Sequence, residues 1–361
     1  MKNTIRLVIN GRFLTQSVTG VQRYAHEFVH ALDNLLDERT DLEVRLLSPR
    51  LSGNAPVYRN IDHQTVGRLQ GHLWEQLELP RFVNGATLFC PGNTAPVASM
   101  LGSGRVVVTV HDLSYLYFPQ AYNRAFRLLY NTLIPLILRR ATIVITVSNS
   151  ERESILKYYP FAKKRLTAIQ NGGLPVGVTP SPVVVADDPY VLYVGSLSKR
   201  KNFPGMFNVA CKLARDRGLR FTFIGGIPDG IADSLTQIPD DIRDRIVFMG
   251  QVNDWEVLMQ QYCSAACFFF PSFYEASPLP PIEAMACGCP VIAASIPSLI
   301  ERCGDAALYC DPASIESMAD AVERLVDDRA LQQTLREKGY HRAESYSWMN
   351  CVKQTLVLVL G

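Results

Sequence analysis

Short apolar runs that end in polar turns recur along the first half of the chain. These runs are rich in β-branched residues, which predicts strands. Between several of them the chain has segments such as residues 21–36, where apolar residues repeat with the 3.6-residue period of a helix. The runs are IRLVIN, LEVRLLS, ATLFCPGN, RVVVTVHD and TIVITVSNS. Strands that alternate with helices indicate a parallel sheet covered by helices.

The same alternation restarts in the second half after a segment without helical period. Residues 172–189, which read GGLPVGVTPSPVVVADDP, are rich in Pro, Gly and Val, and we expect the linker there. Helices are expected from about Pro204 and over residues 313–328. The apolar runs are YVLYVGS, RFTFIGG, RIVFMGQ, AACFFFPS, PVIAAS and ALYCDP. A second doubly wound α/β domain follows from this pattern.

The length agrees with two domains. A chain of 361 residues suits two cores of ordinary size better than one. We expect one domain over residues 1–175 and another over 176–345. The last apolar segment, residues 346–361, is expected to form a helix that packs back toward the N-terminal domain.

Composition favours a soluble, cytoplasmic protein. Apolar residues make up 48% and charged residues 19%, and no apolar stretch is long enough to span a membrane. The opening MKNTIRLVINGRF turns polar too early for a signal peptide. Nine scattered cysteines fit a reducing compartment. The pairs Cys263/Cys267 and Cys287/Cys289 lie in apolar segments, so we interpret them as buried structural cysteines rather than metal ligands.

Charge is distributed unevenly. Residues 1–180 contain 20 basic and 12 acidic residues, whereas residues 181–361 contain 16 and 22. Within the basic half, residues 123–141 are apolar with four arginines and no acid. This segment could lie against an anionic membrane. It could equally pack as an ordinary interdomain helix pair, because Pro135 is expected to break any long amphipathic face.

A cluster of cations follows the first strand of the second half. Lys199, Arg200 and Lys201 precede a helix that should begin near Pro204. Cations beside the free N–H groups of a helix N-terminus form a site for phosphate, although such a loop can also be merely solvated. Gly225 and Gly226 after the next strand lack the G-x-G-x-x-G spacing, so a nicotinamide oxidoreductase is not supported.

Two glutamates flank a proline-rich turn in SFYEASPLPPIEAMACGCP. We expect a short helix that starts at Pro280 and stops at Gly288, which puts Glu283 in its first turn and Glu275 in the loop before it. A carboxylate accepts hydrogen bonds from paired hydroxyls, and sugars and ribose are rich in such pairs. The alternative is that Glu283 only complements the helix dipole and Glu275 is a loop charge.

Together with YVGSLSKRKN and TGVQRY, this E-x7-E pattern closely resembles the retaining family 4 glycosyltransferases of GT-B fold. TVHDLSYLYFP, VSNSERESI and IQNGG extend the resemblance over nearly the whole chain. It implies two Rossmann-like domains that face a central cleft. The N-terminal domain would bind the acceptor and the C-terminal domain the nucleotide sugar.

The resemblance also implies roles for individual residues. Lys201 would neutralise the diphosphate, Glu275 would bind hydroxyls of the transferred sugar, and Glu283 would bind the ribose. His111 would lie near the reacting sugar, with Lys201 and Glu275 as the other catalytic residues; alternatively, it is a satisfied histidine that caps the end of the strand RVVVTV. The other donor-binding positions implied are Gly20, Gly195, Ser196, Arg200, Val252, Ser277 and Leu279.

The chain departs from the family pattern at two places. Many members have Arg directly after the strand's glycine, but here that position is Ser196, so Arg200 or Lys199 would supply the second cation. The flexible loop of the family contains Pro278 here, which removes a backbone N–H donor. The resemblance therefore implies donor contacts through Glu275, Glu283 and Lys201 rather than through the backbone of this loop.

These features lead to a functional hypothesis. We expect a retaining hexosyltransferase of bacterial surface polysaccharide synthesis that uses a nucleotide sugar and a saccharide or lipid-linked acceptor. The residues leave the donor's base and sugar open, and GDP-mannose is the working hypothesis. No D-x-D triplet occurs, which argues against a carboxylate-held metal, and we expect neither a cofactor nor a nucleic-acid partner. A sugar-nucleotide epimerase or hydrolase and a non-catalytic binding subunit are the alternatives.

Overall fold

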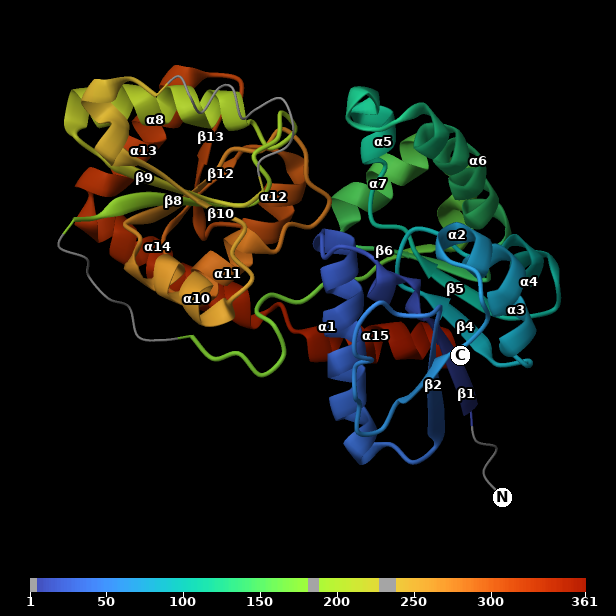
Figure 1. Cartoon of the computed structure of the whole chain (residues 1–361). Helices are drawn as coiled ribbons and strands as arrows, with labels where there is room; N and C mark the ends of the chain where they lie inside the picture. The colour runs from blue at the N-terminus through green and yellow to red at the C-terminus, as the bar shows by residue number, and fades with distance from the viewer. Residues whose placement is uncertain (1–4, 181–187, 227–237) are drawn as a thin grey trace. The chain divides into compact units, whose positions relative to one another are not determined.

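The computed structural model describes residues 5–180, 188–226 and 238–361 (Figure 1). The chain folds into two compact units: Met1–Val176 with Ser347–Gly361 form unit 1, and Gly177–Tyr346 form unit 2. Residues 181–187 of the predicted linker lie outside the described residues. Each unit is built on its own parallel sheet, so the predicted pair of α/β domains is confirmed.

Unit 1 contains a seven-stranded parallel sheet in the order β3-β2-β1-β4-β5-β6-β7. Its strands are β1 (Ile5–Asn10), β2 (Leu42–Ser48), β3 (Asp62–Thr65), β4 (Thr87–Cys90), β5 (Val106–Thr109), β6 (Ile143–Thr146) and β7 (Leu166–Ala168). The two edge strands were not predicted. β3 reads DHQT and carries no buried residue, and β7 has three residues, so neither shows a hydrophobic pattern.

Helices and short helical turns connect these strands. The helices are α1 (Gly20–Leu35), α2 (Gly71–Leu73), α3 (Leu79–Phe82), α4 (Val97–Leu101), α5 (Ser114–Tyr117), α6 (Arg124–Arg140), α7 (Asn149–Tyr158) and α15 (Trp348–Leu360). The turns are η1 (Gly11–Thr15), η2 (Leu36–Glu38), η3 (Trp74–Glu78), η4 (Pro119–Ala121) and η5 (Pro160–Lys164), of which η3 is π-helical.

Helix α6 corrects one expectation. Asn123 caps its start by accepting a hydrogen bond from the Phe126 amide at 2.8 Å, and the helix then continues through Pro135 to Arg140. The proline therefore does not divide the segment into a helix pair. Leu133, Ile134, Ile137 and Leu138 bury one face around the proline, and this packing maintains the helix despite the hydrogen bond that proline removes.

The C-terminal helix α15 packs within unit 1 against α1 and β4. Trp348 at its start fills the space beside Gly172, where an added Cβ would lie 2.5 Å from the indole. Arg105 donates to the carbonyls of Leu358 and Val359 at its end, at 2.7 and 3.2 Å. These contacts fix both ends of the helix, and the Trp348 ring also packs edge-on against Tyr24 of α1, with centroids 5.7 Å apart.

Unit 2 contains a six-stranded parallel sheet in the order β10-β9-β8-β11-β12-β13. Its strands, all six predicted from the sequence, are β8 (Tyr190–Val194), β9 (Arg220–Ile224), β10 (Ile246–Gly250), β11 (Cys267–Phe270), β12 (Val291–Ala294) and β13 (Ala307–Cys310).

Helices cover both faces of this sheet (Figure 1). Helices α8 and α13 lie over one face, whereas α10, α11 and α14 lie over the other. The helical elements are α8 (Phe203–Arg217), η6 (Asp240–Arg245), α10 (Trp255–Ser264), α11 (Pro280–Ala286), α12 (Pro297–Cys303), α13 (Ile315–Asp327) and α14 (Arg329–Glu344). The predicted start of α11 at Pro280 is confirmed, and Gly288 just beyond its end has φ +72°.

In each unit the order of strands reverses at the middle of the sheet. The reversal lies between β1 and β4 in unit 1 and between β8 and β11 in unit 2. The connections from two such strands leave on opposite sides, which opens a crevice beyond their carboxyl ends where ligands of α/β proteins bind. The residues that follow these four strands are therefore the candidates for a ligand site.

Candidate active site

The loop after β8 presents the predicted cations of unit 2. The Ser198 carbonyl accepts hydrogen bonds from the amides of Lys201 and Phe203, at 3.1 and 3.2 Å, which folds the loop into a tight turn before α8. Asn202 at the end of this turn has φ +61°, and its side chain donates to the Pro312 carbonyl at 2.7 Å. The anchored turn directs Arg200 and Lys201 toward the loop after β11.

Lys201 and Glu275 form an ion pair between these two loops. Arg200 Nη1 lies 3.8 Å from the other carboxylate oxygen of Glu275 and donates to the Tyr274 carbonyl at 3.1 Å. The backbone joins the loops as well, because the Phe273 amide donates to the Arg200 carbonyl at 3.1 Å. The structure therefore brings together three residues predicted from the sequence.

The second glutamate lies deeper in unit 2. Glu283 is in the first turn of α11, as predicted, and only 1% of it is exposed. Its Oε2 accepts a hydrogen bond from the hydroxyl of Tyr262 in α10 at 3.1 Å. Tyr262 was not predicted from the sequence, because a tyrosine on the apolar face of an amphipathic helix is typical of an ordinary core residue.

Lys199, the first cation of the cluster, does not lie beside Glu275 as Arg200 does. Lys199 is exposed; its backbone carbonyl accepts a hydrogen bond from the Asn202 amide at 3.0 Å, but no hydrogen bond or ion pair joins its side chain to any of the described residues. Ser196, which occupies the position of the family's arginine, is exposed as well. Between the two cations that the sequence left open, Arg200 is therefore the one beside Glu275.

The remaining predicted residues of unit 2 line the ends of its strands. Gly195 directly follows β8 and has φ +149°, and buried Tyr193 donates from its hydroxyl to the Ser196 carbonyl at 2.9 Å. Val252 follows β10 and is half-buried. Ser277 is half-buried and Leu279 is buried in the loop that carries Glu275.

A buried arginine supports the loop between the two glutamates. Arg302 of α12 is 1% exposed, and its Nε donates to the Pro278 carbonyl at 3.1 Å. Its guanidinium lies over the ring of Tyr346 at 4.1 Å, and the Tyr346 hydroxyl donates to the Arg302 carbonyl at 3.0 Å. Nothing in the sequence near Arg302 indicated this contact, which spans 24 residues.

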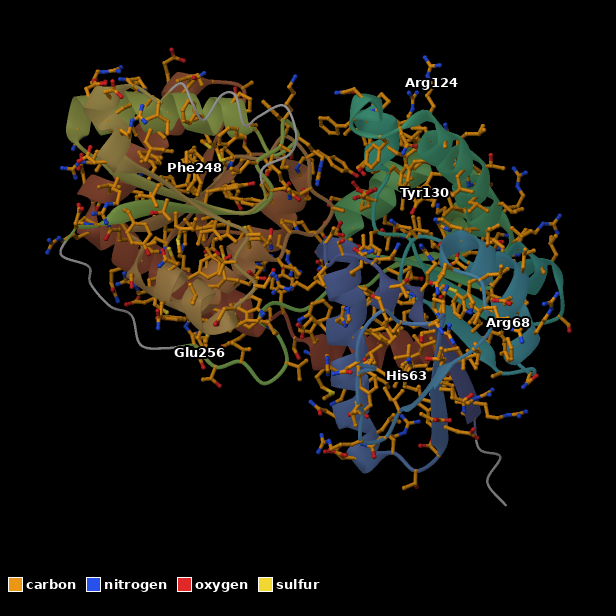
Figure 2. The ribbon with its side chains drawn as sticks, in the orientation of Figure 1. His63, Arg68, Arg124, Tyr130, Phe248 and Glu256 are labelled. Atoms are coloured by element: carbon orange, nitrogen blue, oxygen red, sulfur yellow. The ribbon has the colours of Figure 1, made fainter. Side chains whose placement is uncertain are left out.

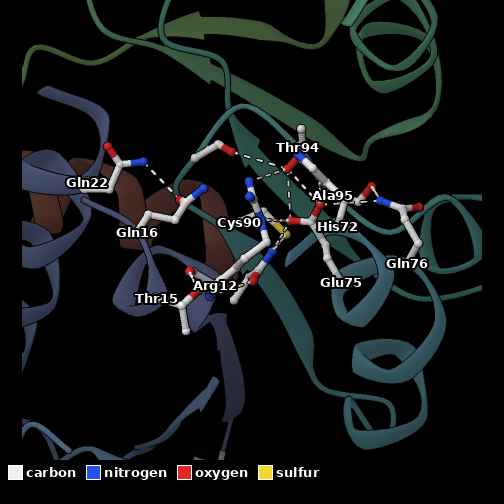
Figure 3. Close-up of polar contacts among 12 residues, drawn as sticks. Arg12, Thr15, Gln16, Gln22, His72, Glu75, Gln76, Cys90, Thr94 and Ala95 are labelled. Atoms are coloured by element: carbon white, nitrogen blue, oxygen red, sulfur yellow. Dashed lines mark hydrogen bonds and ion pairs between the residues drawn. The ribbon is translucent and has the colours of Figure 1, made fainter. Parts of the chain in front are cut away.

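Unit 1 contains a buried polar network that the sequence analysis missed (Figure 3). Glu75, which is 0% exposed, accepts hydrogen bonds from Asn10 Nδ2 at 2.6 Å, Arg12 Nε at 3.2 Å and Thr94 Oγ1 at 2.8 Å. His72 Nδ1 lies 3.3 Å from the same carboxylate. These partners come from the ends of β1 and β4 and from the turn around η3, so they meet at the strand reversal.

The π-helical turn η3 and the strand ends aim these side chains inward. An acidic residue in the apolar segment HLWEQLEL was the available signal for Glu75, and the signal for Arg12 was its place after a strand and a glycine.

Burial by itself would raise the pKa of Glu75, but the His72 hydrogen bond, the Arg12 charge and the Thr94 hydroxyl outweigh it and lower that pKa.

A pocket of about 350 Å³ opens beside this network. Arg12, Glu75 and Asn93 contribute polar groups to its wall, and Tyr122 and Phe126 contribute aromatic rings. Its size is at the lower end of the roughly 300–1,000 Å³ typical of small-molecule sites. Its position beyond β1 and β4 matches the strand reversal of unit 1.

His111 supports the wall of this pocket. Its Nε2–H donates to the Pro91 carbonyl at 2.7 Å, and its backbone amide donates to Asn93 Oδ1 at 2.7 Å. Burial lowers the pKa of His111, and the ring lies edge-on to Tyr24 at 4.7 Å. This geometry agrees with the interpretation of a satisfied histidine at the end of the strand, and its place near a reacting sugar stays a prediction. Gly20 likewise lies in unit 1, where it begins α1.

Comparison with known families decides the identity of the fold. The model described as Glycosyltransferase Family 4 matches residues 18–172, and the model described as Glycosyl transferases group 1 matches residues 188–328. The two matches follow one another along the chain and coincide with the two sheets. The chain is a family 4 glycosyltransferase.

Curated relatives and solved structures agree with this assignment. The glycosyltransferase is 29% identical over 265 residues to the O-antigen chain mannosyltransferase B of Escherichia coli, which covers 70% of this chain and 69% of that protein. It is 25% identical to the O-antigen chain mannosyltransferase RfbU of Salmonella typhimurium, over 88% of this chain and 90% of that protein.

The structure of sucrose-phosphate synthase from Thermosynechococcus elongatus superposes with a TM-score of 0.74 at 23% identity, over 98% of both chains. The structure of WaaG, a glycosyltransferase involved in lipopolysaccharide biosynthesis, superposes with a TM-score of 0.72 at 14% identity, over 99% of this chain and 100% of that chain. These similarities establish the GT-B fold that the sequence predicted.

The described residues contain no group of three or more His, Cys, Asp or Glu side chains placed to hold a metal ion. All nine cysteines are free, and Cys263, Cys267, Cys287 and Cys289 are buried, which agrees with their structural interpretation. Among the described helices, none is long and apolar enough to cross a membrane.

The Glu75 network predicts an acid-sensitive contribution to stability. Because Glu75→Gln removes one partner of a buried ion pair, we expect the free energy of unfolding at pH 7 to fall by about 3 kcal/mol. The lowered pKa means that the wild-type advantage is present above the unfolded pKa of about 4.3 and is lost as pH falls through the folded pKa. Urea unfolding of both proteins from pH 7 to pH 3 checks this; a pH-independent difference would contradict it.

The Arg302 contact predicts a positioning effect on donor binding. Arg302→Met removes the donor to Pro278, so the loop with Glu275 loses its fixed geometry, and we expect the KM for a nucleotide sugar to rise about tenfold or more. Arg336→Met is the matched control, because Arg336 Nε makes a similar bond to the Gly288 carbonyl at 2.9 Å beyond the other end of α11. Equal changes of KM in both variants would indicate a structural effect only.

Proposed function

We propose that the enzyme transfers mannose, with retention of configuration, from a nucleotide sugar to a saccharide or lipid-linked oligosaccharide acceptor of a bacterial surface polysaccharide. The names of its relatives, two O-antigen mannosyltransferases, support the sugar and the pathway class. The observation that carries the proposal is the group of Lys201, Arg200 and Glu275 at the strand reversal of unit 2.

Lys201 and Arg200 would stabilise the leaving group. When the anomeric C–O bond breaks, its electron pair stays on the diphosphate, and the two cations at the start of α8 balance that charge together with the free N–H groups of the helix. Lys201 pairs with Glu275 in the structure. A donor would take over this cation and leave the carboxylate to accept hydrogen bonds from hydroxyls of the sugar.

Retention follows if the acceptor attacks the face from which the diphosphate departs. The acceptor oxygen then bonds to the anomeric carbon, and its proton passes to an oxygen of the departing phosphate. In this mechanism no carboxylate of the protein has to act as nucleophile. Glu275 serves to position the sugar.

Further residues would complete the binding of the substrates. Glu283 would accept hydrogen bonds from the ribose, with Tyr262 fixing its carboxylate. Val252 would meet the base through its backbone. Unit 1 would bind the acceptor, with Gly20 allowing close approach to the donor and His111 near the reacting sugar. Gly20 has open space around its Cα, since an added Cβ would meet no atom within 4 Å.

We also propose that helix α6 rests on an anionic membrane at the cytoplasmic side. Arg124, Arg127 and Arg139 are exposed on this helix, and Leu128 between them is 72% exposed. Arg124 extends away from the ribbon (Figure 2). A helix that presents arginines and an apolar residue on one exposed face gains both electrostatic and apolar contact with lipid. This location would keep the enzyme near a lipid-linked acceptor.

Replacement of Lys201 tests the catalytic proposal. We expect Lys201→Ala to lower kcat by about 10²–10³-fold with folding intact, because one charge that stabilises the departing diphosphate is lost. The assay follows release of the nucleoside diphosphate from GDP-mannose and product formation with a mannose-containing acceptor. Lys199→Ala, which removes an exposed lysine two residues away, serves as the control and should retain activity.

Two outcomes would change the proposal. Near-normal turnover of Lys201→Ala would remove Lys201 from the mechanism. Consumption of the donor by the wild type without any glycosylated acceptor would favour a hydrolase or epimerase.

Sedimentation with liposomes tests the membrane contact. We expect the simultaneous replacement of Arg124, Arg127, Arg139 and Arg140 by Ala to lower binding to anionic vesicles, because each basic residue contributes about 1 kcal/mol at such a surface. Binding should also fall as salt rises. The control replaces four exposed arginines outside α6, namely Arg6, Arg50, Arg68 and Arg81. Equal binding of the two variants would count against a role of α6.

A further inference from the structure

Hydrogen bonds hold the guanidinium of Arg12 in place in the pocket of unit 1, but they do not occupy all of its N–H donors. Arg12 donates from Nε to Glu75 at 3.2 Å and from Nη2 to Thr94 at 3.0 Å. For its Nη1, the parts of the chain that the structure describes provide no hydrogen-bond partner. Because Arg12 lines the pocket, its remaining N–H groups are available to a ligand at a defined position.

An acceptor of hydrogen bonds lies in the same pocket. Asp112 Oδ1 accepts hydrogen bonds from the amide and hydroxyl of Ser114, at 3.0 and 2.7 Å. Its Oδ2 has no hydrogen-bond partner within residues 5–180, 188–226 and 238–361. The pocket therefore offers a fixed donor from Arg12 and a carboxylate acceptor from Asp112. Hydroxyl groups, which both donate and accept, are the ligand groups that satisfy both.

The charges of the pocket disfavour an anion. Glu75 lies against Arg12 and is ionised at neutral pH, since its pKa is lowered, and so it balances the guanidinium charge. Asp112 adds a further negative charge to the wall. A carboxylate or phosphate would meet no net positive charge here and would be repelled by Asp112 at close range. An uncharged ligand meets no such penalty.

One wall of the pocket is a stack of aromatic rings. Tyr122 and Phe126 stack with centroids 4.9 Å apart and an angle of 14°, and Phe126 and Tyr130 stack at 4.0 Å and 20°. All three line the pocket. The C–H groups of a pyranose ring carry partial positive charge, and the faces of aromatic rings carry partial negative charge, so a sugar ring packs favourably on this wall.

We propose that this pocket binds an uncharged sugar ring of the acceptor and that Glu75, by neutralising Arg12, makes it discriminate against acidic sugars. This assignment rests on the proposed function, since the bound sugar is the acceptor of that transfer. Arg12 and Asp112 hold hydroxyls of the ring, and Phe126 packs against its face.

Ligand-observed NMR with simple glycosides tests the pocket without donor or turnover. The probes are methyl α-mannopyranoside, methyl α-glucopyranoside and the methyl glycoside of glucuronic acid. We expect the two neutral glycosides to bind the wild-type enzyme more tightly than the acidic one, by about tenfold, which corresponds to one unfavourable charge contact. Equal or tighter binding of the acidic glycoside, or no binding of either neutral glycoside at millimolar concentrations, would overturn the proposal.

Two variants locate the binding. Arg12→Lys keeps the charge but loses the forked donor, and Phe126→Ala removes the ring from the wall; each should weaken neutral glycosides about tenfold. Phe126→Ala should disturb folding less than Arg12→Lys, because Phe126 is half-buried and its side chain has no polar contact to lose. Phe161→Ala, which removes an exposed aromatic ring outside the pocket, is the matched control and should bind as wild type. Unchanged binding in Phe126→Ala would overturn the proposal.

The same variants separate this proposal from the proposed function. Binding of GDP-mannose, measured by thermal shift, should be unchanged in Phe126→Ala, because the proposed site for the nucleotide sugar lies in unit 2 and Phe126 lies in unit 1. If the wild type transfers sugar but Phe126→Ala has an unchanged KM for the acceptor, the pocket assignment fails and the function stands. If neutral glycosides bind as expected but no nucleotide sugar supports transfer, the proposed function fails.

Discussion

The reversal of strand order at the middle of each parallel sheet is the constraint on which the rest of this structure depends. The connections after β1 and β4, and those after β8 and β11, leave on opposite sides of their sheet and so open a crevice beyond the carboxyl ends of the strands. Polar residues at the start of both connections line this crevice and meet there. Arg12 and Thr94 meet in this way in unit 1, and Lys201 and Glu275 in unit 2. The chain thus repeats one topological device in two units with different side chains.

A cation and a carboxylate pair at both reversals, but the two pairs differ in burial. The side chain of Glu75 is completely buried, and its hydrogen-bonding groups are Asn10, Arg12, Thr94 and His72, so this pair is a permanent part of unit 1. The side chain of Lys201 is 14% exposed, and a ligand phosphate can compete for it with Glu275. Breaking a buried pair leaves an uncompensated charge unless a ligand group replaces the lost partner. The side chains of Lys201 and Glu275 are 14% and 6% exposed, against 9% and 0% for Arg12 and Glu75, so the pair in unit 2 is the more accessible of the two.

The loops at these sites depend on side chains that hold proline carbonyls. Arg302 donates to Pro278 between the two glutamates of unit 2, and His111 donates to Pro91 beside the pocket of unit 1. A proline offers no backbone N–H of its own, so its segment has fewer bonds with which to fix its position. A buried donor from another element supplies that bond. Both donors are far from the loop in sequence, which links the site to helix α12 in one unit and to strand β5 in the other.

The amino-acid sequence was enough to predict the strands with clear apolar runs, the start of α11 at Pro280, and the positions of Lys201, Arg200, Glu275 and Glu283 after strands. These features depend on local periodicity and on the fixed φ of proline. It did not reveal β3 or β7, which have no hydrophobic pattern. The expectation that Pro135 breaks the amphipathic face of residues 123–141 was wrong, because the buried face of α6 outweighs the local effect of proline. The Arg12–Glu75 network, the Pro278–Arg302 contact and the choice of Arg200 over Lys199 were decided by tertiary structure alone. Their partners lie 63, 24 and 75 residues apart in the sequence, and only the packing of separate strands and helices brings such groups within hydrogen-bonding or ion-pair distance.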